Sequence, residues 1–189
     1  KAPPYTIYTA STVYGGNLME QTTITHIKFY LVTGLISTAI LGTLSHSFYE
    51  WSGYSRGIAL FSPVNESTWE HMKLVFFPVL LWSFFMPRAI RNAYPSLYPA
   101  LITGNLAGTF LIPVLFYVYS GILGKNITFV DISIFFISIV VVFYIAWKGK
   151  SSHRIYRQRK LISWLTILLT LAFFWFTFLP PGIGLFQEP

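Results

Sequence analysis

Apolar residues gather in five long stretches of this chain, and short polar stretches separate them. Each apolar stretch has about twenty residues or more, enough for an α-helix to cross a hydrocarbon layer about 30 Å thick. The fourth stretch is rich in Ile, Val and Phe, as buried strands are, but its length favours a helix. The pattern predicts an all-α fold, a polytopic transmembrane bundle of about five helices. The predicted helices cover residues 29–48, 67–86, 98–123, 129–147 and 161–179.

Local signals refine two of these helices. Ser62 followed by Pro63 offers an N-cap with proline at the first helical position, and Ser67 and Glu70 have the spacing of a capping box. The second helix is therefore predicted to begin near Ser62 or Ser67. In the third helix, Gly104 and Gly108 form a small-xxx-small pattern that permits close contact with a neighbouring helix. Between the first two helices, residues 50–62 mix aromatic, basic and aliphatic side chains, so we expect this stretch to lie along the membrane surface.

Composition supports a membrane environment. Of the 189 residues, 54% are hydrophobic and only 10% are charged, against about 25% charged in soluble domains. The aromatic share of 19% fits rings that anchor helices at membrane interfaces. The chain has no cysteine, which excludes disulfides and thiolate chemistry. We expect one transmembrane helical domain over residues 19–189, preceded by a polar extension over residues 1–18 that is either natural or introduced by cloning.

The net charge of +7 has a local origin. Six of the thirteen basic residues lie in the loop before the fifth helix: Lys148, Lys150, Arg154, Arg157, Arg159 and Lys160. A basic loop between two apolar helices favours anionic lipid headgroups over nucleic acid as its partner. Because basic loops stay on the cytoplasmic side, the pattern predicts a multi-pass membrane protein with a cytoplasmic N-terminus and an external C-terminus.

Ionisable residues crowd the junction of the first two helices. His46 and Glu50 share one face of the first helix, while Glu66, Glu70 and His71 surround the start of the second. Charged groups at membrane depth are costly and usually functional. Imidazole and carboxylate groups can hold a divalent metal ion such as Zn²⁺, or relay protons, or bind a transported cation. The candidate metal ligands are His46, Glu66, Glu70 and His71. The candidate residues of a ligand or proton site are Glu50, Glu66, Glu70, Lys73 and Asn65.

Structural roles compete with these functional ones. Glu70 can complete the capping box with Ser67, and Glu66 suits a helix N-terminus because of the helix dipole. Lys73 is one turn after Glu70, and we expect these two residues to pair. The hypothesis is therefore a cation or small polar ligand site, in a metal-dependent membrane hydrolase or a small transporter. The rival hypothesis is a non-catalytic membrane subunit that packs against partner membrane proteins or further copies of itself.

Two sequence stretches carry a family resemblance. Residues 46–51 (HSFYEW) and 60–74 (LFSPVNESTWEHMKL) resemble the signature of an uncharacterised family, a domain of unknown function found in small prokaryotic integral membrane proteins. Residues 180–189 are similar as well. The resemblance implies several transmembrane helices and a bacterial or archaeal plasma membrane, and it implies no activity, cofactor or site residue.

Overall fold

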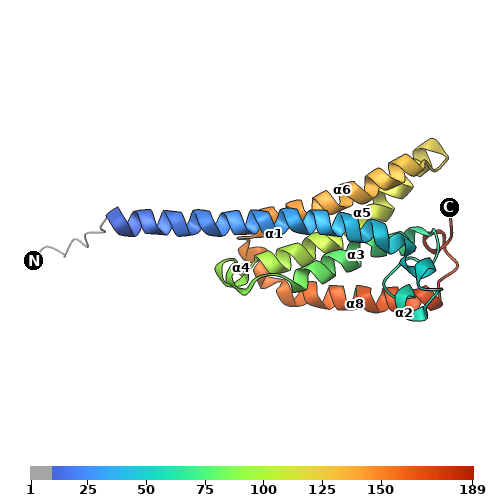
Figure 1. The fold of residues 1–189 in the computed structure, drawn as a ribbon. Helices are drawn as coiled ribbons and strands as arrows, with labels where there is room; N and C mark the ends of the chain where they lie inside the picture. The colour runs from blue at the N-terminus through green and yellow to red at the C-terminus, as the bar shows by residue number, and fades with distance from the viewer. Residues whose placement is uncertain (1–9) are drawn as a thin grey trace, which may run out of the picture.

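The structure, a computed structural model, describes the backbone of residues 10–189 and the side chains of residues 21–189 apart from residue 23. The described part is helical and contains no strand, which confirms the predicted all-α bundle. Five long helices run antiparallel to one another in chain order (Figure 1). They are α1 (Ala10–Trp51), α3 (Thr68–Phe84), α5 (Leu97–Leu123), α6 (Thr128–Gly149) and α8 (Arg159–Phe178). The short elements between and after them are α2 (Arg56–Ala59), α4 (Arg88–Ala93), α7 (His153–Arg157) and the 3-10 helix η1 (Gly184–Phe186).

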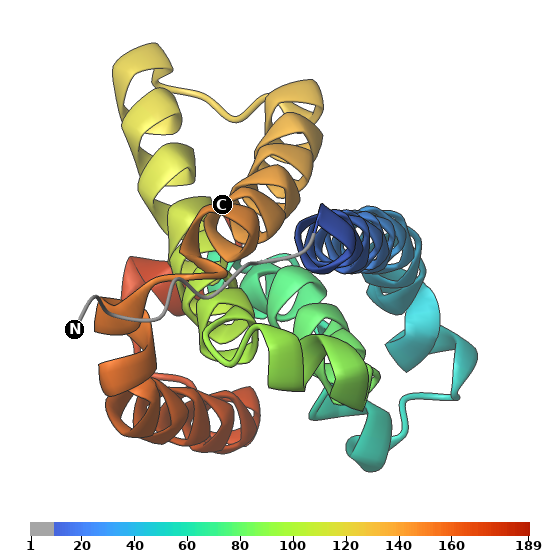
Figure 2. The same cartoon turned by 90° about the vertical axis from the view of Figure 1, so that its left-hand side faces the viewer.

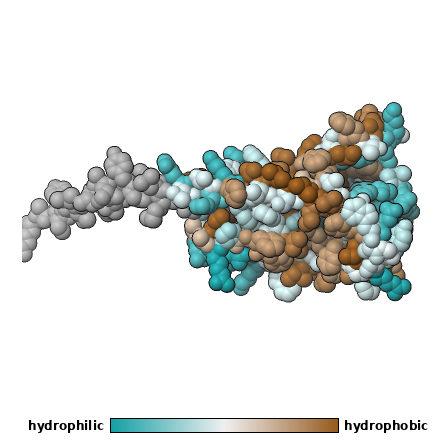
Figure 3. All heavy atoms as spheres, viewed as in Figure 1, coloured by the Kyte–Doolittle hydropathy of each residue, from teal (hydrophilic) through white to brown (hydrophobic). Residues whose placement is uncertain are grey.

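Among the described residues, four helices are long and apolar enough to cross a membrane. These spans are Ile24–Trp51, Leu97–Leu123, Thr128–Gly149 and Arg159–Phe178. The fifth pass, α3, has 17 residues and is the helix most enclosed by its neighbours, since it packs between α1 and α5 (Figure 2). On the face shown in Figure 3, apolar side chains form a belt between two hydrophilic ends. The chain is therefore an integral membrane protein.

The helix bounds match the apolar stretches closely, with one exception. The ends of α3, α5, α6 and α8 lie within two residues of those predicted. The first helix is much longer than predicted, because α1 begins at Ala10 and continues to Trp51. A hydropathy pattern marks only the part of a helix that suits lipid, and no proline interrupts α1 where it becomes polar. The proposed extension, residues 1–18, lies outside the described residues except for the backbone of residues 10–18, which belongs to α1.

The close packing of α5 on α6 depends on two glycines. A Cβ atom at Gly104 would lie 2.3 Å from the carbonyl oxygen of Val142, and one at Gly108 would lie 2.8 Å from that of Ser138. The neighbouring backbone leaves no room for a larger residue at either position. The small-residue pattern of the third predicted helix is thus the contact surface between α5 and α6.

The two ends of the bundle carry opposite charge. We call the end where α4 and α7 lie the basic end, and the end where α2 and η1 lie the acidic end (Figure 1). The basic end holds Arg88, Arg91, Lys148, Lys150, Arg154, Arg157, Arg159 and Lys160. The acidic end holds Glu50, Glu66, Glu70, Asp131 and Glu188, together with Arg56, Lys73 and Lys125.

Candidate metal centre

Three side chains meet at the acidic end. His46 comes from the last turns of α1, Glu66 from the loop before α3, and His71 from the first turn of α3. One carboxylate oxygen of Glu66, Oε2, lies 3.5 Å from Nε2 of His46 and 3.3 Å from Nε2 of His71. One ligand atom from each residue lies within 4.8 Å of the other two. The fold therefore brings together three of the four predicted metal ligands.

The turn that leads into α3 sets the position of this cluster. The backbone N–H of Ser67 donates to the side-chain oxygen of Asn65 over 3.0 Å, which forms a tight turn that presents Glu66. The hydroxyl of Ser67 then accepts a hydrogen bond from the N–H of Glu70, and this bond caps α3. Glu66 and His71 are held on either side of one helix cap.

A backbone carbonyl orients the His71 ring. The Nδ1 atom of His71 lies 3.0 Å from the carbonyl oxygen of Ser67, which can only accept a hydrogen bond. Nδ1 therefore carries the proton, and in the neutral ring Nε2 presents its lone pair toward Glu66. A metal ion could take Nε2 of His71 and Oε2 of Glu66, which lie 3.3 Å apart, as ligands. Metal-binding histidines are commonly oriented in this way by a carbonyl on the other ring nitrogen.

The two distances from Glu66 and the exposure of the cluster suit a tetrahedral metal ion, whereas the three ligand atoms together lie only within 4.8 Å of one another. Two ligand atoms of a zinc site with bonds of about 2.0–2.1 Å lie about 3.3–3.4 Å apart, close to both distances from Glu66. The side chains of His46, Glu66 and His71 are 43%, 61% and 30% exposed. A metal ion bound here would keep a coordination position open to solvent, as zinc ions with two histidines and one glutamate do in enzymes.

Glu70, the fourth predicted metal ligand, points elsewhere. Its Oε2 atom lies 2.6 Å from Nζ of Lys73 and accepts a hydrogen bond from the N–H of Val64. Lys73 is fully buried and also donates to the carbonyl oxygen of Ala59 and the hydroxyl of Thr177. This buried ion pair joins α2, α3 and α8 at the acidic end. It holds the loop that carries Glu66 in place, but it contributes no ligand to the cluster.

Comparison with known proteins places the chain in a family. Residues 19–189 match the model of a family of unknown function, DUF6512. The chain belongs to this family. No curated protein and no solved structure matches the chain. The DUF6512 assignment agrees with the resemblance carried by residues 46–51 and 60–74, and those stretches contain every residue of the cluster.

Two further sequence candidates in the DUF6512 chain have different surroundings. Asn65 shapes the turn beside Glu66, as described above. Glu50 is exposed one turn after His46 on α1, and its carboxylate has no ion pair or hydrogen bond among the described residues. Thr177 of α8 was not singled out from the sequence, because a hydroxyl that lies 104 positions from its partner Lys73 leaves no local pattern.

An apolar groove lies beside the centre. Its volume is about 280 Å³, and it runs between α1 and α3. Ser45 and Phe48 flank His46 in the sequence and line the groove, and Phe61 and Phe77 line its other side. The groove is lined mainly by apolar side chains, and Ser45, which lines it, directly precedes His46 of the cluster. The DUF6512 fold thus places an apolar surface and a possible metal centre side by side.

Proposed function

We propose that this DUF6512 chain is a membrane hydrolase that binds a divalent metal ion, such as Zn²⁺, at His46, Glu66 and His71. The observation that carries the proposal is the pair of 3.3 Å and 3.5 Å distances from one oxygen of Glu66 to two imidazole nitrogens. The orientation of His71 by the carbonyl of Ser67 supports it, since the free nitrogen of that ring then faces the cluster.

In this proposal the chain supplies three ligands, a base and a place for the substrate. A zinc ion with three protein ligands can lower the pKa of a bound water to about 7 and polarise a carbonyl or phosphoryl group. Glu50 is exposed one turn after His46 on α1 and has no partner among the described residues, so we assign it as the base that accepts the proton of that water. The groove beside Ser45 and Phe48 suits the alkyl chain of a lipid-like ester, amide or phosphate.

The position of the cluster favours hydrolysis over transport. Substrate sites of transporters lie near the middle of the membrane, where the two sides can gain access in turn. The cluster of His46, Glu66 and His71 lies instead at one end of the bundle. The centre of the bundle is packed, with Val75, Phe76 and Val79 of α3 fully buried. We further propose that the acidic end faces the outside and the basic end faces the cytoplasm, as basic loops do.

The first test measures the metal. Protein purified in detergent is titrated with Zn²⁺, and bound metal is quantified after desalting. Wild type is expected to bind one equivalent, whereas His71→Ala and Glu66→Gln lower the affinity by about 100-fold or more. His153→Ala is the matched control, because this histidine lies in α7 at the opposite end. Weak binding by wild type, or equal loss in the His153 variant, would rule out the metal centre.

The second test measures hydrolysis. Vesicles that contain phospholipids with fluorogenic acyl ester, amide or phosphate bonds are mixed with wild type and with Glu50→Gln. If Glu50 is the base, the variant keeps its zinc but hydrolyses about 10²-fold more slowly. Stoichiometric zinc with no turnover of any of the three bond types contradicts the hydrolase and leaves a metal-binding membrane subunit.

A further inference from the structure

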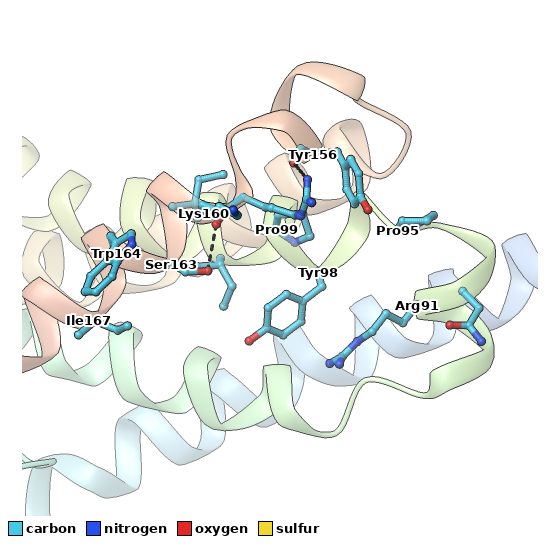
Figure 4. Close-up of a pocket in the computed structure, with 13 residues that line it drawn as sticks. Arg91, Pro95, Tyr98, Pro99, Tyr156, Lys160, Ser163, Trp164 and Ile167 are labelled. Carbon is cyan, nitrogen blue, oxygen red and sulfur yellow. Dashed lines mark hydrogen bonds between the residues drawn. The ribbon is translucent and has the colours of Figure 1, made fainter.

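A second cleft lies at the basic end, far from the cluster of His46, Glu66 and His71. Its volume is about 760 Å³, and it separates α4 and the start of α5 from α7 and the start of α8 (Figure 4). Arg91 and Tyr98 lie on one side of it, and Tyr156 and Lys160 on the other. No role at this end follows from the proposed hydrolase, so the cleft requires its own explanation.

The arginines of the cleft are held by aromatic rings. The guanidinium carbon of Arg91 lies 4.7 Å from the ring centre of Tyr98, and that of Arg159 lies 4.3 Å from the ring centre of Tyr156. Arg159 also donates to the carbonyl oxygen of Tyr156 over 3.1 Å. A stacked guanidinium is ordered by the ring beneath it while its edge keeps N–H donors for an anion.

Among the described side chains, no carboxylate pairs with the cations of the cleft. The ion pairs formed by the described side chains involve Glu66 and Glu70, both at the acidic end. Arg91, Arg159 and Lys160 are exposed and therefore carry uncompensated charge around one cleft. The same fact makes a zwitterionic headgroup a poor fit, since no described carboxylate in the cleft can pair with a choline or ethanolamine cation.

The cleft is apolar on its membrane side. Ile102 of α5 and Ile167 of α8 line it one or two turns further into the bundle than the basic residues. Trp164, which also lines it, is 64% exposed, as an aromatic side chain at a membrane interface is. The basic residues at the rim of the cleft match the headgroup of a phospholipid, and the aliphatic side chains on its membrane side match the acyl chains.

We propose that this cleft binds an anionic phospholipid, with its phosphate among Arg91, Arg159 and Lys160 and an acyl chain along Trp164 and Ile167. Charge complementarity selects the lipid, because basic pockets between transmembrane helices retain acidic headgroups. The bound lipid bridges α5 and α8. The inference is independent of the metal centre and of its chemistry.

The experiment measures lipid retention by native mass spectrometry of the full chain in detergent. Phosphatidylglycerol is compared with phosphatidylcholine that has identical acyl chains. Wild type retains phosphatidylglycerol preferentially, and the double variant Arg91→Gln with Arg159→Gln binds it about 10- to 30-fold more weakly, as expected for two lost cations. The matched control is Arg154→Gln with Arg157→Gln, which removes two exposed charges at the same end but outside the cleft. The control binds within about threefold of wild type.

Three results would overturn the proposal. An equal loss in both double variants means that diffuse charge, and not the cleft, attracts the lipid. Equal retention of phosphatidylcholine removes the charge argument. Displacement of phosphatidylglycerol by millimolar inorganic phosphate means that the cleft takes a free anion and not a lipid. Thermal unfolding of the cleft variant confirms that it is folded, and Lys160→Gln provides a single substitution with a smaller loss in the same direction.

Discussion

The two ends of this bundle hold their charges in different ways. At the acidic end, Lys73 is buried against Glu70, and Glu66 lies between two histidines. At the basic end, the arginines of the cleft are exposed and lie on tyrosine rings with no described carboxylate nearby. At the acidic end, Glu66 and Glu70 have partners within the chain. The basic end leaves its charges for a partner outside the chain.

This difference separates two kinds of function. Groups that face each other at short, fixed distances can select a small ligand such as a metal ion. Exposed cations around an open cleft attract a large, soft anionic surface, and the attraction weakens as salt screens it. A membrane supplies that surface at one end only, because its cytoplasmic face is the more negative one. The contrast between the ends therefore predicts that the basic end faces the cytoplasm, and cysteine labelling can test this orientation.

The largest expected effect concerns which end faces out. Because the chain has no cysteine, single cysteines can be placed at exposed positions, Ser55→Cys at the acidic end and Ser151→Cys at the basic end. In intact cells, a membrane-impermeant maleimide is expected to label the first at least about tenfold more than the second, since basic loops stay inside. Permeabilised cells provide the control, in which both label. The opposite preference would reverse the orientation and move the metal centre to the cytoplasm.

The next effect is on stability at the acidic end. Lys73→Met leaves the buried carboxylate of Glu70 without its cation, and we expect the free energy of unfolding to fall by about 3–5 kcal/mol. The measurement is thermal or denaturant unfolding in detergent. Zinc affinity is expected to fall with it, because Lys73 no longer donates to the carbonyl oxygens of Ala59 and Ser62, which precede Glu66 in the same connection.

Two further variants test this explanation. Lys125→Met removes an exposed lysine near the same end and should change stability by less than about 0.5 kcal/mol. Lys73→Met combined with Glu70→Leu replaces both charges by apolar groups and should recover most of the loss. If the double variant is no more stable than the single one, the loss of stability in Lys73→Met does not come from the uncompensated charge of Glu70.

A smaller effect on stability is expected from the contact between α5 and α6, which run between the two ends of the bundle. Gly104→Ala places a Cβ atom against the backbone of Val142, so α5 and α6 must separate. We expect a loss of about 1–3 kcal/mol in unfolding experiments. Gly121→Ala is the matched control in the same helix, because nothing lies within 4 Å of that position. Equal behaviour of the two variants would show that α5 does not depend on close contact with α6.

The fold was largely predictable from the sequence, and the reason is physical. In lipid, backbone groups must be satisfied within the helix, so an apolar stretch of about twenty residues has one structure available to it. The ends of α5, α6 and α8 follow from this rule, and Gly104 already indicated close packing. The polar part of α1 was not predictable, since outside lipid a polar segment can be helix or coil and hydropathy does not distinguish them.

The cluster was predictable only in part. The crowding of histidine and glutamate residues indicated the correct helix junction. The sequence alone does not show which of Glu66 and Glu70 joins the histidines. What separates them is the buried position of Lys73 and its contacts with α2 and α8, which depend on the tertiary fold. For the basic end, the sequence predicted a basic loop before the fifth helix but no cleft. Each stacked arginine and tyrosine pair is local in the sequence. The meeting of the two pairs around one cleft depends on the tertiary fold, which no local pattern encodes.

The smallest predicted effect separates the cap of α3 from the candidate ligands. Ser67→Ala removes the hydroxyl that accepts the N–H of Glu70 but keeps the backbone carbonyl that orients His71. Loss of such a cap typically costs about 1 kcal/mol, and unfolding experiments measure it. Zinc affinity should change little, because the carbonyl and the three ligands remain. Ser133→Ala is the control, since that hydroxyl donates only within its own helix and should cost less than about 0.5 kcal/mol.

The stability and the zinc affinity of Ser67→Ala together show whether the helix cap and the ligand cluster depend on each other. If stability falls while zinc affinity is kept, the turn through Asn65 positions Glu66 by itself, and the metal centre needs only the path of the backbone there. If zinc affinity falls by tenfold or more at the same loss of stability, the hydroxyl of Ser67 positions the ligands directly. In that case the acidic end is a single cooperative unit in which helix cap, ion pair and ligand cluster form together, whereas the charges of the basic end remain independent of one another.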